Sequence, residues 1–177
     1  MKSLVSVAAV ATLAAIALLA VPLTASADPG RVIAKDDCDP VSFNLAVGPG
    51  TCVGDGSTVF GDFIGQLVNH QFAGAWRFSP KQVNLDAGSS LVVTNRGGET
   101  HTFTEVTQFG GGGIVEDLNL ILFGTATPPT FFFPPFRFID SGETITITSA
   151  TLTPGTHRFF CAIHPWMEET VVVEPSA

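Results

Sequence analysis

Three side chains that bind soft metal ions lie within seven residues near the carboxyl end of the chain. Cys161, His164 and Met167 form a C-x-x-H-x-x-M sequence between two strand-like segments. Thiolate, imidazole and thioether groups select copper when a second imidazole completes a trigonal plane and the methionine sulfur takes a long axial position. His101, at the start of an earlier strand-like segment, is the best candidate for that second imidazole. The pattern predicts one copper ion held by these four side chains.

Each of these residues has a simpler interpretation when it is taken alone. A buried inert thiol, a surface histidine and a methionine in a core are all common. Their joint spacing and the odd number of cysteines favour a metal site. A structural zinc site is disfavoured because zinc prefers thiolate, imidazole or carboxylate to a thioether. The other two histidines, His70 and His157, have no neighbouring ligand pattern, and we interpret them as structural.

The start of the chain indicates export. An apolar run over residues 4–21 is followed by the triplet Ala25, Ser26, Ala27, which is typical of a cleaved secretory signal peptide over residues 1–27. The alternative is an uncleaved membrane anchor, since the run is almost long enough to span a bilayer. We expect a periplasmic or extracellular protein with no membrane span after the signal is removed.

The cysteine count agrees with an oxidising compartment. Three cysteines allow one pair and leave one thiol for chemistry. Cys38 and Cys52 are the natural pair because both lie in a stretch rich in glycine and aspartate before the strongest strand-like segments. We therefore expect a disulfide between them and a free thiol at Cys161.

Net charge restricts the partners. The formal charge of the chain is −8, and residues 1–27 contain one lysine and no acid, so the remaining 150 residues carry −9. An acidic surface cannot neutralise phosphates, which argues against nucleic acid. It can steer a basic protein toward productive encounter, and we expect a redox partner protein with a basic docking surface. Glu168 and Glu169 directly follow Met167. We interpret them either as a solvated turn or as an acidic rim that contacts such a partner.

Short strand-like segments separated by glycine and proline turns organise the chain. Residues 28–57 read as a turn-rich N-terminal extension that includes an edge strand over residues 41–47, and residues 58–177 read as one domain. The strand-like segments of that domain cover residues 58–70, 73–78, 83–85, 91–94, 101–107, 136–139, 143–149, 156–161 and 170–174. Segments at this spacing predict an all-β fold, a Greek-key β-sandwich.

Residues 108–136 interrupt this pattern and are rich in glycine, phenylalanine and proline. An apolar stretch over residues 114–123 predicts a short helix that ends at Gly124. The segment is too short to bury a core of its own, so we interpret it as an insertion that lies on the sandwich. We expect its phenylalanines, Phe131 to Phe133 and Phe136, to pack against the sandwich instead of forming an exposed docking patch.

The ligand loop resembles that of amicyanin and, more broadly, that of the plastocyanin-like cupredoxins, which are small blue copper proteins. The region of the first histidine agrees as well, with Phe78, Ser79, Pro80, Gly88, Asn95 and Phe103 placed as in the family. The resemblance covers roughly residues 73–107 and 136–174. It implies a cupredoxin-like fold and a type 1 copper site with His101 and His164 as nitrogen ligands, Cys161 as thiolate and Met167 as axial ligand.

The resemblance also implies one-electron transfer, with His164 as the point where the electron leaves. Two positions depart from the family pattern. Thr102 stands where relatives often have asparagine, so a hydroxyl must make the hydrogen bond that joins the two ligand loops. His157 stands where the family commonly has tyrosine, a residue type that this chain lacks.

A one-electron carrier is therefore the favoured function. A copper delivery or sensing module is the alternative, although Met167 is the only methionine after the signal peptide and a methionine-rich Cu(I) relay is absent. A multicopper oxidase or nitrite reductase fragment would need further coppers and histidines. The chain has four histidines, and the neighbours of Cys161 are Phe160 and Ala162. We expect a protein that is not an enzyme.

Overall fold

The computed structural model describes residues 29–132, 135–148 and 150–175. The predicted signal peptide, residues 1–27, lies outside the described residues. Within the described part of the chain, no helix has the length and apolar character that a membrane crossing requires.

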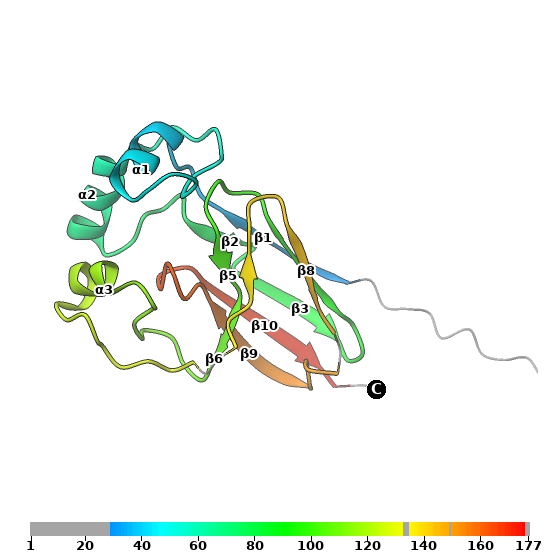
Figure 1. The fold of residues 1–177 in the computed structure, drawn as a ribbon. Helices are drawn as coiled ribbons and strands as arrows, with labels where there is room; N and C mark the ends of the chain where they lie inside the picture. The colour runs from blue at the N-terminus through cyan, green and yellow to red at the C-terminus, as the bar shows by residue number, and fades with distance from the viewer. Residues whose placement is uncertain (1–28, 133–134, 149, 176–177) are drawn as a thin grey trace, which may run out of the picture.

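Two four-stranded sheets form a sandwich (Figure 1). The first sheet has the order β2-β1-β4-β8, with bounds Arg77–Ser79, Gly30–Lys35, Leu91–Asn95 and Thr144–Ile147. The second has the order β3-β10-β9-β6, with bounds Gln82–Asp86, Glu168–Glu174, Gly155–Phe160 and Thr104–Val106. A short pair is formed by β5, His101–Thr102, and β7, Phe138–Ile139. The prediction of an all-β sandwich is confirmed.

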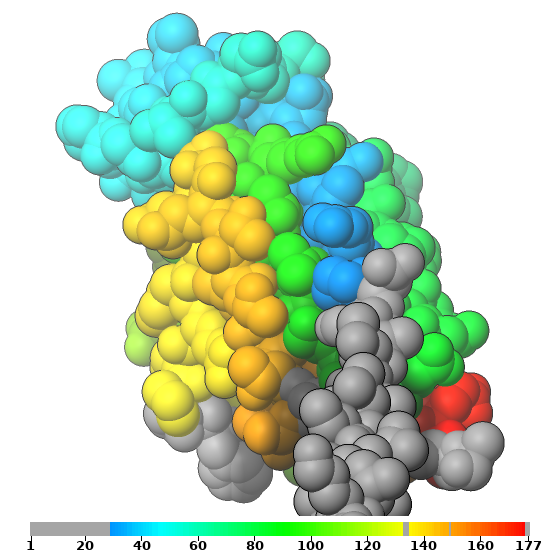
Figure 2. Space-filling model, turned by 90° about the vertical axis from the view of Figure 1, so that its right-hand side faces the viewer, coloured from blue at the N-terminus to red at the C-terminus, as the bar shows by residue number. Residues whose placement is uncertain are grey.

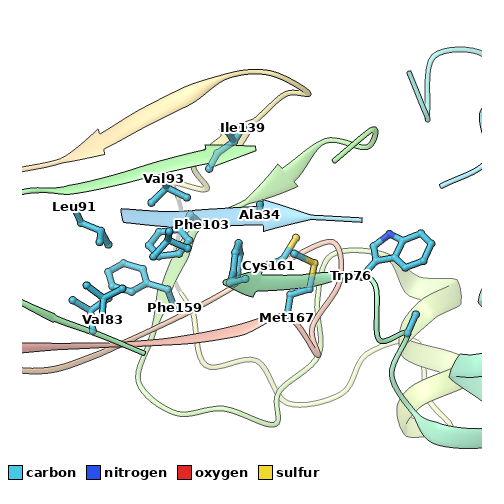
Figure 3. Packing of buried hydrophobic residues seen from close by; sticks show 14 of the residues in the cluster. Ala34, Trp76, Val83, Leu91, Val93, Phe103, Ile139, Phe159, Cys161 and Met167 are labelled. Atoms are coloured by element: carbon cyan, nitrogen blue, oxygen red, sulfur yellow. The ribbon is translucent and has the colours of Figure 1, made fainter. Parts of the chain in front are cut away.

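The core lies between the two sheets. In β4 and β10 buried and partly exposed residues alternate, as expected for strands with one face in a core. Phe103 stacks on Phe159 with ring centroids 4.4 Å apart. Figure 3 shows this packed centre continuing to Cys161 and Met167, with Trp76 beyond them. The core therefore fixes the position of the ligand loop.

Three helices lie at the end of the sandwich where the ligand loop is found (Figure 1). Their bounds are α1 Pro40–Ala46, α2 Phe60–His70 and α3 Glu116–Phe123. Figure 2 shows the region of α1 and α2, in blue to cyan, as a lobe at one end of the molecule. These helices add a cover over that end of the sandwich.

Two of the helices replace predicted strands. The prediction of a strand over residues 58–70 is wrong because Phe60, Phe63, Ile64 and Leu67 recur at the spacing of one helix face. The prediction of an edge strand over residues 41–47 is also wrong. There the Asp39 side chain accepts a hydrogen bond from the Ser42 backbone and caps α1, and Pro40 occupies the first turn.

Residues 30–35 form β1 and do not have the turn-rich character that was expected for residues 28–57. This strand pairs antiparallel with β2 and parallel with β4. Val32 and Ala34 alternate with less buried neighbours and point into the core. The acidic and glycine-rich residues on either side concealed this short alternation in the sequence.

The insertion at residues 108–136 largely follows the prediction. The expected helix is confirmed as α3, and Gly124 ends it in the left-handed conformation with φ of 71°. Phe132 packs on Phe160 with ring centroids 5.2 Å apart, and Phe136 packs on Phe132 at the same distance. The expected packing against the sandwich is confirmed for these two rings, while Phe133 lies outside the described residues.

Candidate metal centre

His101, Cys161 and His164 come together inside the protein. Nδ1 of His101 lies 3.8 Å and Nδ1 of His164 lies 3.6 Å from Sγ of Cys161, and the two Nδ1 atoms are 3.2 Å apart. All three side chains are buried. One thiol and two imidazole nitrogens converge on a single point, an arrangement that can hold one metal ion.

The sandwich positions these ligands from two elements. His101 opens β5, and Cys161 follows the last residue of β9. The loop from Cys161 to Met167 is closed by its own backbone, because the Cys161 N–H donates to the Met167 carbonyl at 3.0 Å and the Met167 N–H donates to the His164 carbonyl at 2.9 Å. The loop therefore returns on itself and presents its side chains from one short segment.

Met167 joins the same group of residues. Its side chain is buried, and Figure 3 shows its sulfur beside the side chain of Cys161. A thioether is a soft and weak donor that suits a long axial position. Met167 thus lies in the same core cluster as Cys161 and is a candidate for the axial ligand.

Two hydrogen bonds join the ligand loop to β5. The Thr102 backbone N–H donates to Sγ of Cys161 at 3.3 Å, and the Ala162 N–H donates to Oγ1 of Thr102 at 2.6 Å. The Thr102 hydroxyl therefore makes the hydrogen bond that joins the segment of His101 to the ligand loop, as expected from the sequence.

The site favours the thiolate form of Cys161. Burial raises the pKa of the thiol, but its hydrogen bonds with His101 and His164 outweigh burial and hold the pKa well below its usual range. The thiolate is the form of cysteine that binds metal ions.

Each histidine has a carboxylate at the far side of its ring. Nε2 of His101 donates to Oδ2 of Asp36 at 2.9 Å. Nε2 of His164 lies 3.6 Å from Oε2 of Glu99, which also accepts a hydrogen bond from Trp76 Nε1. The hydrogen bond to Asp36 fixes the His101 tautomer that leaves Nδ1 free for a metal, while Glu99 is too far from His164 for a hydrogen bond. Sequence reasoning missed both carboxylates, although Glu99 stands only two residues before His101.

Asp36 and His101 stabilise each other. Burial raises the pKa of Asp36, but hydrogen bonds from His101 and from the Gly98 backbone outweigh it and hold the pKa below its usual value. Burial lowers the pKa of His101, but the hydrogen bonds to Asp36 and Cys161 outweigh it and raise the pKa to about 9. The pair holds the His101 ring in a single orientation.

No family model and no curated protein matches this chain. Among solved structures, a purple cupredoxin from Nitrosopumilus maritimus has a TM-score of 0.42 and 14% identity, covering 82% of this chain and 99% of that one. Amicyanin from Paracoccus versutus has a TM-score of 0.36 and 18% identity, covering 55% and 73%. A Cu-containing nitrite reductase from Thermus scotoductus has a TM-score of 0.37 and 20% identity, covering 57% of this chain and 21% of the reductase.

At these identities and TM-scores the likeness to cupredoxins concerns the fold alone.

His164 does not reach the surface of the protein. Its side chain is only 2% exposed, and its ring contacts the rings of Phe63 at 6.5 Å and Trp166 at 5.4 Å between centroids. An exit for the electron through His164 therefore stays a prediction, and a partner cannot touch the ring directly. The physical reason is that α2, which the sequence pattern misread as a strand, covers this side of the site with Phe63.

Glu168 and Glu169 do not form the acidic rim that was considered. Glu169 faces inward on β10 and is fully buried, and neither of its carboxylate oxygens has a hydrogen-bond partner among the described residues. Burial raises its pKa to about 8, which favours the protonated form of the side chain. Glu168 is partly buried, and burial raises its pKa as well. The surface beside Met167 is therefore less acidic than the sequence indicates.

His157 lies apart from the ligands, and its ring is bonded on both sides. Nδ1 lies 2.7 Å from Oε1 of Glu105, and Nε2 lies 2.8 Å from the Thr153 carbonyl. These contacts agree with the structural interpretation of this residue.

Asp36→Asn is expected to lower copper affinity about 10- to 100-fold, the usual effect of losing a hydrogen-bonded partner of a metal ligand. The amide cannot supply the negative charge that holds the His101 ring. Competition with a copper chelator measures the affinity. Asp37→Asn is the matched control, since the Asp37 carboxylate bonds Ser57 and Thr58 instead of a ligand. Equal affinities of the two variants would contradict the role of Asp36.

His157→Gln is expected to reduce stability in a pH-dependent way. Burial lowers the pKa of His157, but its bonds to the Thr153 carbonyl and Glu105 outweigh this and raise the pKa. The charged ring therefore adds stability that is fully present below the unfolded pKa of about 6.5 and is lost as the pH rises through the folded pKa. Urea unfolding should show a loss of at most about 1 kcal/mol near pH 5.5, since the pair is partly exposed, and a smaller loss near pH 9. A loss that grows toward pH 9 would contradict this prediction.

Proposed function

We propose that this chain is an exported type 1 copper protein that carries one electron at a time and is not an enzyme. The observation that carries the proposal is the convergence of two Nδ1 atoms and the Cys161 sulfur on one buried point. A thiolate, two imidazoles and the thioether of Met167 fit copper, and they fit zinc poorly because zinc seldom takes a thioether. When bound, copper supplies a Cu(II)/Cu(I) couple.

The residues of the chain hold these ligands in one arrangement. The backbone bonds of the loop and the Thr102 hydroxyl fix Cys161, and Asp36 fixes the His101 ring. Ligands that stay in place in both oxidation states keep the rearrangement on electron transfer small. The Thr102 N–H donates to the sulfur and stabilises its negative charge, which tunes the reduction potential.

Burial of the site supports electron transfer over substrate turnover. His101, Cys161, His164 and Met167 are each at most 2% exposed, and the four side chains together fill the coordination set of a blue copper site. A substrate has no open ligand position to occupy there. The same burial opposes rapid delivery of copper to another protein, because the ion leaves only when the loop opens.

Export is supported by the disulfide that joins Cys38 and Cys52, since such bonds form and persist in oxidising compartments. The proposed location is the periplasm or the exterior of the cell. Mass spectrometry of the mature protein from the exported fraction should give a chain that begins at Asp28. Recovery of the full-length chain from the cytosol would contradict export.

Voltammetry of the copper-loaded protein, together with a copper-transfer assay, tests the proposed function. A carrier should give a fast, reversible one-electron response and should lose Cu(I) to a chelator slowly. A sluggish redox response with rapid copper transfer would contradict the proposal and support a delivery role.

A further inference from the structure

A groove lies over the ligand loop beside Trp166 and Met167. It has a volume of about 310 Å³ and is lined by the connection between α2 and β2, by Lys81 and by residues 166–168. Met167, the proposed axial ligand, thus forms part of its floor. The groove brings the surface of the protein next to Met167, a residue of the proposed copper site.

The side of the site that His164 faces offers a poorer route to a protein partner. Nε2 of His164 points toward Glu99 inside the protein. A cavity of about 220 Å³ lies there, lined by apolar side chains of α1, α2 and α3 as well as by His164 and Glu99. A cavity of this size admits a small molecule, whereas a protein surface cannot approach the ring closely.

Trp166 connects the ligand set with the groove. Its ring contacts the His164 ring at 5.4 Å between centroids. Its Nε1 donates to the Ala73 carbonyl at 3.3 Å, and Ala73 also lines the groove. The indole is thus held in place, touching a proposed copper ligand and bordering the groove.

The groove carries local positive charge on an acidic protein. Arg77 and Lys81 are both exposed there, and Nη1 of Arg77 donates to the Gly74 and Ala75 carbonyls at 3.1 and 3.2 Å. The only carboxylate that lines the groove belongs to Glu168, which is partly buried. Two cations against one carboxylate fit a partner that presents acidic groups beside its redox centre, in place of the basic docking surface expected from the net charge.

We propose that electrons enter and leave the protein through Trp166 at this groove, where a redox partner with an acidic docking surface binds. The inference rests on the proposed function as an electron carrier. In the exchange the reduced site loses one electron and the partner gains one, and no bond or proton is transferred. Arg77 and Lys81 hold the partner, and Trp166 bridges the distance between the partner and the His164 and Met167 side of the site.

Binding at the groove is tested on the copper-free protein with hexacyanochromate(III), a paramagnetic anion that is inert in redox reactions. Added to ¹⁵N-labelled protein, it should broaden the backbone amide signals of residues 73–81 and 166–168. Lys81→Glu should remove that broadening, whereas Arg158→Glu, the same charge change at an exposed site on β9, should leave it in place. Broadening centred on other residues would overturn the proposal.

Electron exchange is tested by the rate at which hexacyanoferrate(III) oxidises the reduced, copper-loaded protein. Lys81→Glu should slow the reaction about tenfold, as expected for a charge that guides encounter. Trp166→Leu should slow it with an unchanged Cu(II) spectrum, and Ile121→Trp, which fills the cavity beside His164, should not. A rate that falls in Ile121→Trp and stays unchanged in Trp166→Leu would overturn the proposed route.

A wild-type protein that forms no coloured copper complex would refute the proposed function. The anion mapping would still report on the groove in that case.

Discussion

Cys161→Ser is expected to abolish the intense visible absorption of the Cu(II)-loaded protein. That absorption arises from charge transfer between thiolate and copper, and Cys161 supplies the one thiolate of the ligand set. A serine hydroxyl is not ionised at neutral pH and is too hard a donor to replace it. The visible and electron paramagnetic resonance spectra of the wild type and the variant, both loaded with Cu(II), measure the effect.

The other two cysteines provide the control for this experiment. Cys38 and Cys52 form the disulfide and contribute no sulfur to the site. The double variant C38S/C52S should therefore keep the visible absorption as long as it remains folded. Intense absorption in Cys161→Ser, or its loss only in the double variant, would show that the thiolate ligand has been assigned wrongly.

The same double variant is expected to lose about 3 kcal/mol of stability. The disulfide closes a loop between residues 14 apart in the sequence, and a loop of this length contributes about that much through the entropy of the unfolded chain. Urea unfolding of the oxidised wild type and of C38S/C52S measures the difference. Because domains of this kind are stable by about 5–15 kcal/mol, the variant should still fold.

The disulfide also matters for the site because it joins segments that carry the two carboxylates. Cys38 lies two residues after Asp36. The backbone of Cys52 forms an isolated β-bridge with that of Glu99. Reduction of the wild type should give the same loss of stability as the double variant. Equal unfolding free energies for the oxidised protein and the double variant would contradict a stabilising role for this bond.

The proximity of Cys161 and His164 could be predicted from the sequence because it is local. Cys161, His164 and Met167 lie in one short loop between two strands, so their proximity depends little on the rest of the fold. His101 could be added because it opens a strand-like segment and because the ligand loop resembles a known kind of loop. The partners of the histidines could not be predicted in this way, since Asp36 meets His101 across 65 residues of sequence.

The helix α2 that covers the site could not be predicted, because helix and strand patterns overlap in short apolar segments. Residues 58–70 are rich in phenylalanine, isoleucine and valine, which favour strands, yet Phe63 and Leu67 are buried at helical spacing. Because of this error the sequence did not indicate that Phe63 of α2 covers His164. The error also hid the groove at Trp166, which depends on the connection that follows α2.

X-ray absorption at the copper edge of the Cu(II)-loaded protein tests the central claim most directly. The measurement reports the atoms bound to copper and their distances without relying on colour. The arrangement of His101, Cys161 and His164 predicts one short copper–sulfur bond and two copper–nitrogen bonds from imidazole. A coordination shell made only of nitrogen and oxygen atoms would contradict it.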